Sequence, residues 1–222
     1  MKIDQWIAQS GARVSFVESH ALPIVDVAVE FAAGSAYDRR EQAGLARLTL
    51  AMLKAGSSRY SETEASRRIA DAGAQLRETF DLDRAGFALR SLSSEAERKA
   101  ASQTLADMLQ APLFPAEAFE REKASAIANA REAETLPDQV AERRLYALMY
   151  PAHPYGFSET PETLASIGRE DLERHYRDCY ASARAVVTIV GDLDRDAAKA
   201  LAGRGFRGCG SSTATVSPSS TR

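Results

Sequence analysis

The chain has 222 residues, of which 45% are hydrophobic and 27% are charged, so it is long enough to bury a core in one large domain or two small ones. Its net charge is −3, and acidic residues alternate with Lys and Arg along the helical segments, so no basic surface for nucleic acid is expected. Cys179 and Cys209 are too few for a disulfide framework.

The N-terminal segment lacks the apolar stretch of a signal peptide, and no apolar run reaches the roughly 18 to 20 residues that a membrane helix needs. We therefore expect neither export nor membrane insertion of the chain as it stands. A natural start upstream of Met1 would leave a periplasmic location open, so the compartment stays unassigned.

The first hundred residues predict strands in pairs, separated by a pair of helices. Alternation of apolar and polar residues predicts strands in 13–19 and 23–38 and a hairpin in 74–93. Between them, 43–56 predicts a buried helix and 61–73 a second helix. Ser61 and Glu64 form a capping-box pattern at the start of this second helix, and Gly73 ends it.

The second half predicts mostly helix, followed by one strand. Helical periodicity covers 94–111, 116–134, 137–149 and 160–180, with Pro112, Pro115 and Pro137 as breaks. Residues 183–194 form a nearly continuous apolar run, which predicts a central strand. The order of elements favours an α+β fold, with a mostly antiparallel sheet and helices packed on one face.

We expect one domain over 1–204 and a disordered tail over 205–222, which is rich in Gly, Ser and Thr and has no periodicity. The helical pattern that follows Asp194 stops soon after it begins. We therefore expect that truncation or a frameshift interrupts the natural sequence after about residue 202.

Four segments occur in an order and spacing that resemble a known family. They are LPIVDVAVEFAAGSAYDRREQAGLARLTLAMLKAGS, FEREKASAIANAREAE, HPYG and TPETLASIGREDLERHYRDCYASARAVVTIVGDLD. Over about residues 10–204 the chain is similar to the N-terminal domain of the insulinase/pitrilysin-type zinc peptidases, family M16, which includes the mitochondrial-processing-peptidase-like proteins. The resemblance implies an α+β domain that longer members contain twice.

Active members carry an inverted zinc motif, H-x-x-E-H, on the helix that matches 43–56, and a ligating glutamate on a later helix. The resemblance places Arg47 and Ala51 at the two histidine positions, Leu50 at the position of the general base, and Asn129 at the downstream ligand. A guanidinium, a methyl, an isobutyl and a carboxamide group cannot together hold zinc and activate water. We therefore expect no catalytic or metal residue in this chain and zinc only in a partner, and we expect Leu45, Leu48, Leu50, Met52 and Leu53 to be core residues.

Other residues offer weaker candidates for a site. His175 and Cys179 are four residues apart on one helix and could face one ion, but the helical spacing of Leu172, Tyr176 and Cys179 favours a core position, and no third ligand is apparent. His20 is expected in a solvated turn and His153 in the HPYG turn.

The leading hypothesis is a non-catalytic subunit, or a fragment of one, that pairs with a catalytic M16 subunit to form a peptide-binding proteolytic chamber. Extended peptides would bind there by addition to a strand edge. Two alternatives stay open: a purely structural core-type subunit without peptide binding, and a metallopeptidase with relocated ligands.

Overall fold

A computed structural model describes residues 2–205 of the chain. Six strands in this part form one mixed sheet in the order β1-β2-β6-β3-β5-β4. Their bounds are β1 (Asp4–Ile7), β2 (Arg13–Glu18), β3 (Ile24–Phe31), β4 (Gln75–Phe80), β5 (Ala85–Leu92) and β6 (Ala185–Gly191). Only β2 and β6 pair in parallel, and the other four pairings are antiparallel. The α+β class and the mostly antiparallel sheet are therefore confirmed.

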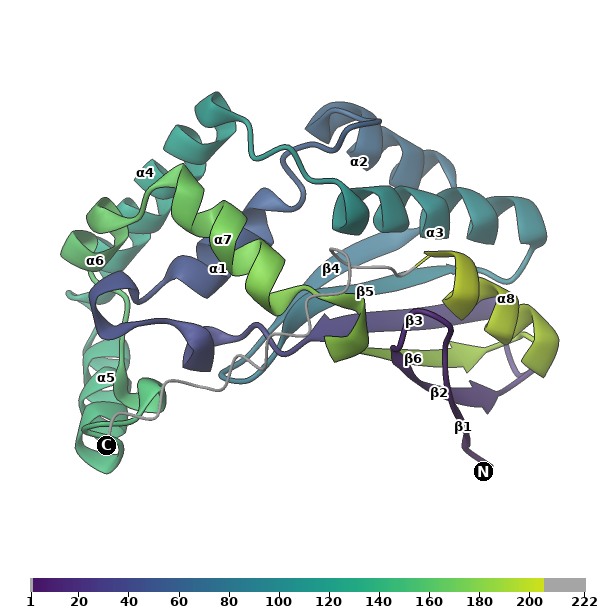
Figure 1. The fold of residues 1–222 in the computed structure, drawn as a ribbon, viewed down its shortest axis with the longest axis horizontal. Helices are drawn as coiled ribbons and strands as arrows, with labels where there is room; N and C mark the ends of the chain where they lie inside the picture. The colour runs from purple at the N-terminus through teal and green to yellow at the C-terminus, as the bar shows by residue number, and fades with distance from the viewer. Residues whose placement is uncertain (1, 206–222) are drawn as a thin grey trace.

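The described residues also form eight α-helices. Their bounds are α1 (Leu45–Met52), α2 (Glu62–Asp71), α3 (Glu95–Gln110), α4 (Ala116–Ala133), α5 (Pro137–Met149), α6 (Pro161–Ser166), α7 (Arg169–Cys179) and α8 (Arg195–Gly205). Figure 1 shows α1, α2, α3 and α7 grouped on one side of the sheet, while α4, α5 and α6 gather beyond its end. None of these helices is long and apolar enough to span a membrane.

The burial pattern of the strands shows where the core lies. In β3 every second residue is buried, from Val25 to Phe31, and the residues between them are only partly covered. This alternation is expected of a sheet that is covered on one face. The central strand β6 keeps the same pattern, and its Val190 is 37% exposed although Thr188 is the one polar side chain of the strand. Strand β6 is thus central in the sheet, as predicted, but helices cover only one of its faces.

The capping box predicted at the start of α2 is present. Ser61 accepts a hydrogen bond from the backbone N–H of Glu64, and the Glu64 carboxylate accepts one from the backbone N–H of Ser61. Gly73 follows the helix with a φ of 60°, the left-handed conformation that commonly ends helices.

Three predictions about elements were wrong or incomplete. The strand predicted over 23–38 ends at Phe31, and Ser35–Tyr37 form a 3-10 helix. The helix predicted over 160–180 is divided into α6 and α7 around Ile167 and Gly168. The Asp171 side chain accepts the N–H of Gly168 and starts α7 anew, while Lys123 donates to the carbonyls of Ala165 and Ile167 at the end of α6. The edge strand β1 was not predicted, because four residues are too few for a clear alternation.

Helix α8 extends to Gly205, the first residue of the segment that we expected to be a tail. The rest of that segment, 206–222, lies outside the described residues, so the predicted disorder there stays a prediction.

Candidate functional site

The helix α1, on which the sequence predicts the degenerate motif, begins at a buried carboxylate. Asp38 is 1% exposed, and its two carboxylate oxygens accept the backbone N–H groups of Gly44 and Ala46 at 2.9 and 2.8 Å. Gly44 precedes the helix with a φ of 102°, which favours glycine. Burial is the main cause that raises the pKa of Asp38 to about 7, and Glu159 adds to the rise, while the two N–H donors and Arg47 oppose it.

Arg47 lies one turn into α1 and extends out of the core. Its guanidinium stacks over the ring of Phe80 at 4.3 Å from the ring centroid, and its Nε lies 3.8 Å from a carboxylate oxygen of Glu159. The Arg47 side chain is 60% exposed. This residue therefore joins α1 to the end of β4 and to the loop before α6, through a cation–π contact and an ion pair longer than a hydrogen bond.

Unlike Arg47, the residues at the next two motif positions, Leu50 and Ala51, are buried or partly buried. Leu50 is 1% exposed and belongs to the main hydrophobic cluster, together with Leu45, Leu48, Met52 and Leu53. Ala51 is partly buried. The predicted core positions of these five apolar residues are thus confirmed.

Asn129 lies on α4, and α4 packs against α1. Its side chain is exposed, whereas the next residue, Ala130, is buried. The structure therefore brings the two helices of the predicted motif together, but it leaves Asn129 facing solvent.

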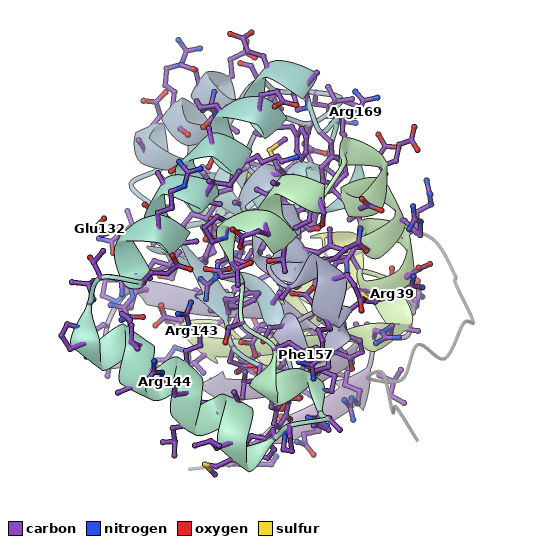
Figure 2. The ribbon with its side chains drawn as sticks, turned by 90° about the vertical axis from the view of Figure 1, so that its left-hand side faces the viewer. Arg39, Glu132, Arg143, Arg144, Phe157 and Arg169 are labelled. Atoms are coloured by element: carbon purple, nitrogen blue, oxygen red, sulfur yellow. The ribbon has the colours of Figure 1, made fainter. Side chains whose placement is uncertain are left out.

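A cavity of about 520 Å³ opens beside Arg47. Its walls come from α1, the end of β4, α4, α5 and the loop before α6, and they include Phe80, Tyr146, Tyr155 and Phe157. Figure 2 labels Phe157 and Arg143, which line it. We call this space the Arg47 cavity. It combines aromatic surface with charged groups of both signs, a composition typical of ligand pockets.

The other titratable candidates lie apart from this cavity. His175 and Cys179 are both buried, with Nδ1 and Sγ 3.9 Å apart. Burial lowers the pKa of His175 to about 4 and raises that of the Cys179 thiol to about 12. The pair is therefore neutral near pH 7, which agrees with the predicted core position.

His20 and His153 have structural partners. His20 is exposed, as expected, and its two ring nitrogens contact Asp192 and Glu18 at 2.6 and 2.9 Å, which raises its pKa. The Nδ1 of His153 accepts the backbone N–H of Tyr155 in the HPYG turn. Within residues 2–205, no group of three or more His, Cys, Asp or Glu residues is placed to hold a metal ion.

The chain thus has an α+β fold in which helices cover one face of a mostly antiparallel sheet, and the two helices predicted to carry the motif, α1 and α4, pack against each other. The sequence profile of Insulinase (Peptidase family M16) matches residues 13–159. The chain belongs to this family.

The relatives of the chain have differing names. The probable mitochondrial-processing peptidase subunit beta of Arabidopsis thaliana is 25% identical over 84% of this chain and 35% of that protein. The uncharacterized zinc protease YmxG of Bacillus subtilis is 24% identical over 86% of this chain and 47% of its own length. The non-peptidase homolog YmxG of Helicobacter pylori is 24% identical over 86% and 44%. The chain thus spans less than half the length of these relatives.

Solved structures support the fold. The peptidase M16 inactive domain from Pseudomonas fluorescens superposes with a TM-score of 0.89 and 29% identity, over 96% of this chain and 53% of that one. A protease from Helicobacter pylori superposes with a TM-score of 0.88 at 16% identity, over 98% and 53%, which shows the shared fold alone.

The zinc that the family implies does not fit the residues present at the predicted positions. Arg47 offers a permanent cation, Ala51 has no donor atom, and Leu50 is buried in the core. Asn129 has a neutral carboxamide and is a weak ligand at best. No step of a zinc-dependent reaction can be assigned to these four residues.

Sequence reasoning missed several residues of this site. Asp38, Phe80, Glu159 and the cavity residues of α5 come from segments far apart in the chain, and none of them matches a motif. Asp38 lies six residues before Gly44, outside the ordinary N-cap position, so the capping pattern gave no local signal for it.

Proposed function

We propose that the chain is a non-catalytic M16-type subunit, or part of one, that pairs with a catalytic M16 subunit and contributes a peptide-binding wall to a shared proteolytic chamber. The observation that supports the proposal is that the fold is retained while the residues at the predicted zinc-site positions are not zinc ligands. The two motif helices, α1 and α4, remain packed together, while the residues at the predicted ligand and base positions are Arg47, Leu50, Ala51 and Asn129.

The geometry beside Arg47 supports a role in binding. On α1, Leu50 lies in the core and not in a metal site. Arg47 stacks on the Phe80 ring, and both residues line the cavity. The β4 strand lies at the edge of the sheet, and an edge strand can accept an extended peptide by adding a strand.

Names of relatives support both parts of the proposal. One relative is called a non-peptidase homolog, and a solved structure with 29% identity is called an inactive domain. Other relatives are called subunits of a processing peptidase.

An exposed apolar stripe on α5 also supports a partner. Leu145, Leu148 and Met149 are 54%, 81% and 57% exposed and lie within four residues of one another on one side of the helix. Large apolar side chains gathered on a surface commonly mark interaction sites.

Co-expression with a zinc-bearing M16 homologue from the same genome tests the proposal. We expect the two chains to co-elute in size-exclusion chromatography, and the pair to cleave an unstructured peptide faster than the homologue alone. A catalytic-site variant of the homologue serves as the control, because it should retain pairing and lose cleavage.

Separate elution, with no change in the homologue's activity, contradicts the proposal. Co-elution without any change in peptide binding or cleavage points instead to the purely structural alternative.

A further inference from the structure

Two arginines face the Arg47 cavity without a hydrogen-bonded partner. Arg47 comes from α1 and Arg143 from α5, and both line the cavity. Within the described residues neither guanidinium donates a hydrogen bond, and each has only an ion pair at 3.8 Å, to Glu159 and Glu134 respectively. A guanidinium carries five N–H donors in a rigid fork, so both groups retain the capacity to bind an oxyanion.

Their surroundings restrict their freedom. The Phe80 ring lies under one face of the Arg47 guanidinium, which limits the orientations of this side chain. The Arg143 side chain is two-thirds covered, at 33% exposure. A pre-oriented and partly desolvated guanidinium loses less entropy and hydration when it binds a carboxylate than a free surface arginine does.

Three carboxylates also line the cavity, and they restrict the choice of ligand. One oxygen of the Asp81 carboxylate, Oδ1, accepts the backbone N–H groups of both Asp83 and Arg84 and so serves its own turn. Glu159 approaches only the Nε side of Arg47. Glu142 is exposed and lies next to Arg143 in the sequence. A small inorganic anion would gain little here, because the three carboxylates outnumber the two arginines.

A carboxylate attached to an extended chain gains more, since the aromatic walls of the cavity can cover its apolar part. Phe80, Tyr146 and Phe157 supply that surface, and a volume of about 520 Å³ holds a large side chain with its neighbours. We propose that the Arg47 cavity binds a carboxylate group of an extended peptide, either an acidic side chain or the C-terminal carboxylate, through Arg47 and Arg143. This inference rests on the proposed function because its ligand is a peptide, and it adds the chemical class that the cavity selects.

Fluorescence anisotropy with labelled peptides tests the inference on the 222-residue chain. Four peptides share one alanine-rich frame: an amidated peptide with a central Glu, the same peptide with Gln, the same with Arg, and a Gln peptide with a free C-terminus. We expect the Glu peptide or the free-acid peptide to bind at least about tenfold more tightly than the amidated Gln peptide, the equivalent of one charge-assisted hydrogen-bonded pair. The peptide that shows the preference identifies the source of the carboxylate.

Matched variants locate the site. Arg143→Ala should remove the preference, whereas Arg144→Ala should retain it, because Arg144 is the exposed neighbour on α5 and does not line the cavity (Figure 2). Glu142→Gln should strengthen binding of the acidic peptide several-fold, since it removes a like charge. Thermal melts of each variant check that the fold is retained.

Equal binding of the amidated Glu, the amidated Gln and the free-acid Gln peptides would overturn the inference. So would tighter binding of the Arg peptide, absence of binding to all four, or equal effects of Arg143→Ala and Arg144→Ala. The co-elution assay of the proposed function does not depend on these peptides. Pairing without a carboxylate preference therefore contradicts only the inference, and a preference without pairing contradicts only the proposed function.

Discussion

At the scale of single residues, charge and burial around α1 are coupled. Asp38 lies at the buried end of the helix and accepts two backbone N–H groups, while Arg47 and Glu159 lie beside it at the surface. Glu159 raises the pKa of the Asp38 carboxyl group and Arg47 lowers it, but burial has the largest effect on this pKa and raises it. The start of this helix is therefore sensitive to the protonation of one side chain.

Asp38 makes stability depend on pH in a definite direction. Its pKa is about 7 in the folded chain, above the ordinary value of 3.8, so the folded state keeps a proton that the unfolded state releases. This contribution is fully present below about pH 4 and is lost as the pH rises to about 7, a change on the order of a few kcal/mol. The Asp38→Asn variant cannot titrate here. We expect the free energy of unfolding of the wild type to fall, relative to that of Asp38→Asn, as the pH rises from 4 to 7.

Urea denaturation at pH 4, 5.5 and 7.5 measures this difference. A wild type that instead gains stability relative to Asp38→Asn over the same range would show that the carboxylate is ionised throughout.

At the scale of elements, α1 is a core helix with one polar residue on its exposed side. Six of its eight residues are buried, and it packs against α4 and α7. A glutamate at position 50 would place a carboxylate among these apolar side chains, at a site with 1% exposure. The local sequence is thus consistent with packing rather than with catalysis.

Alanine substitutions in α1 should lower the free energy of unfolding by different amounts on its buried and exposed faces. We expect Leu50→Ala to lower the free energy of unfolding by about 2 to 5 kcal/mol, because it leaves a cavity in the core. Arg47→Ala should cost no more than about 1 kcal/mol, since it removes a cation–π contact at a largely exposed side chain. Urea denaturation of both variants provides the comparison, and similar losses for the two would contradict this assignment of faces.

At the scale of the whole molecule, one half-covered sheet organises the chain. Helices cover one face, and the matched relatives are about twice as long or longer. The walls of the Arg47 cavity come from segments spread over residues 35–159, so the cavity depends on the packing of these segments against one another.

The purified chain should not retain zinc. We expect substoichiometric zinc by elemental analysis after dialysis, and a melting temperature unaffected by a chelator, because Arg47, Leu50, Ala51 and Asn129 supply no ligand set. A zinc-bearing M16 homologue treated in the same way serves as the control. One zinc per chain that a chelator removes would support the alternative of relocated ligands.

Much of the fold was predictable from the chain alone because its signals are local. Alternation located β2 to β5, and a nearly continuous apolar run located β6. Prolines separated α3, α4 and α5, and Ser61 with Glu64 marked the start of α2. The division between α6 and α7 was missed because it depends on Lys123, which lies 42 and 44 residues before the two residues whose carbonyls it binds at that break. Strand β1 was missed because its pairing with β2, rather than its own short sequence, defines it.

The amino-acid sequence by itself determined the α+β class and the apolar stripe of α1, since both depend on residue type and periodicity. The assignment of Arg47, Leu50, Ala51 and Asn129 to the four motif positions is a prediction that rests on the resemblance to the family. Only the tertiary structure decided that Arg47 stacks on Phe80, that Asp38 is a buried cap and that Arg143 faces the same cavity as Arg47. The physical reason is that periodicity reports which face of an element is apolar. Distances between side chains from separate elements arise only when those faces pack together.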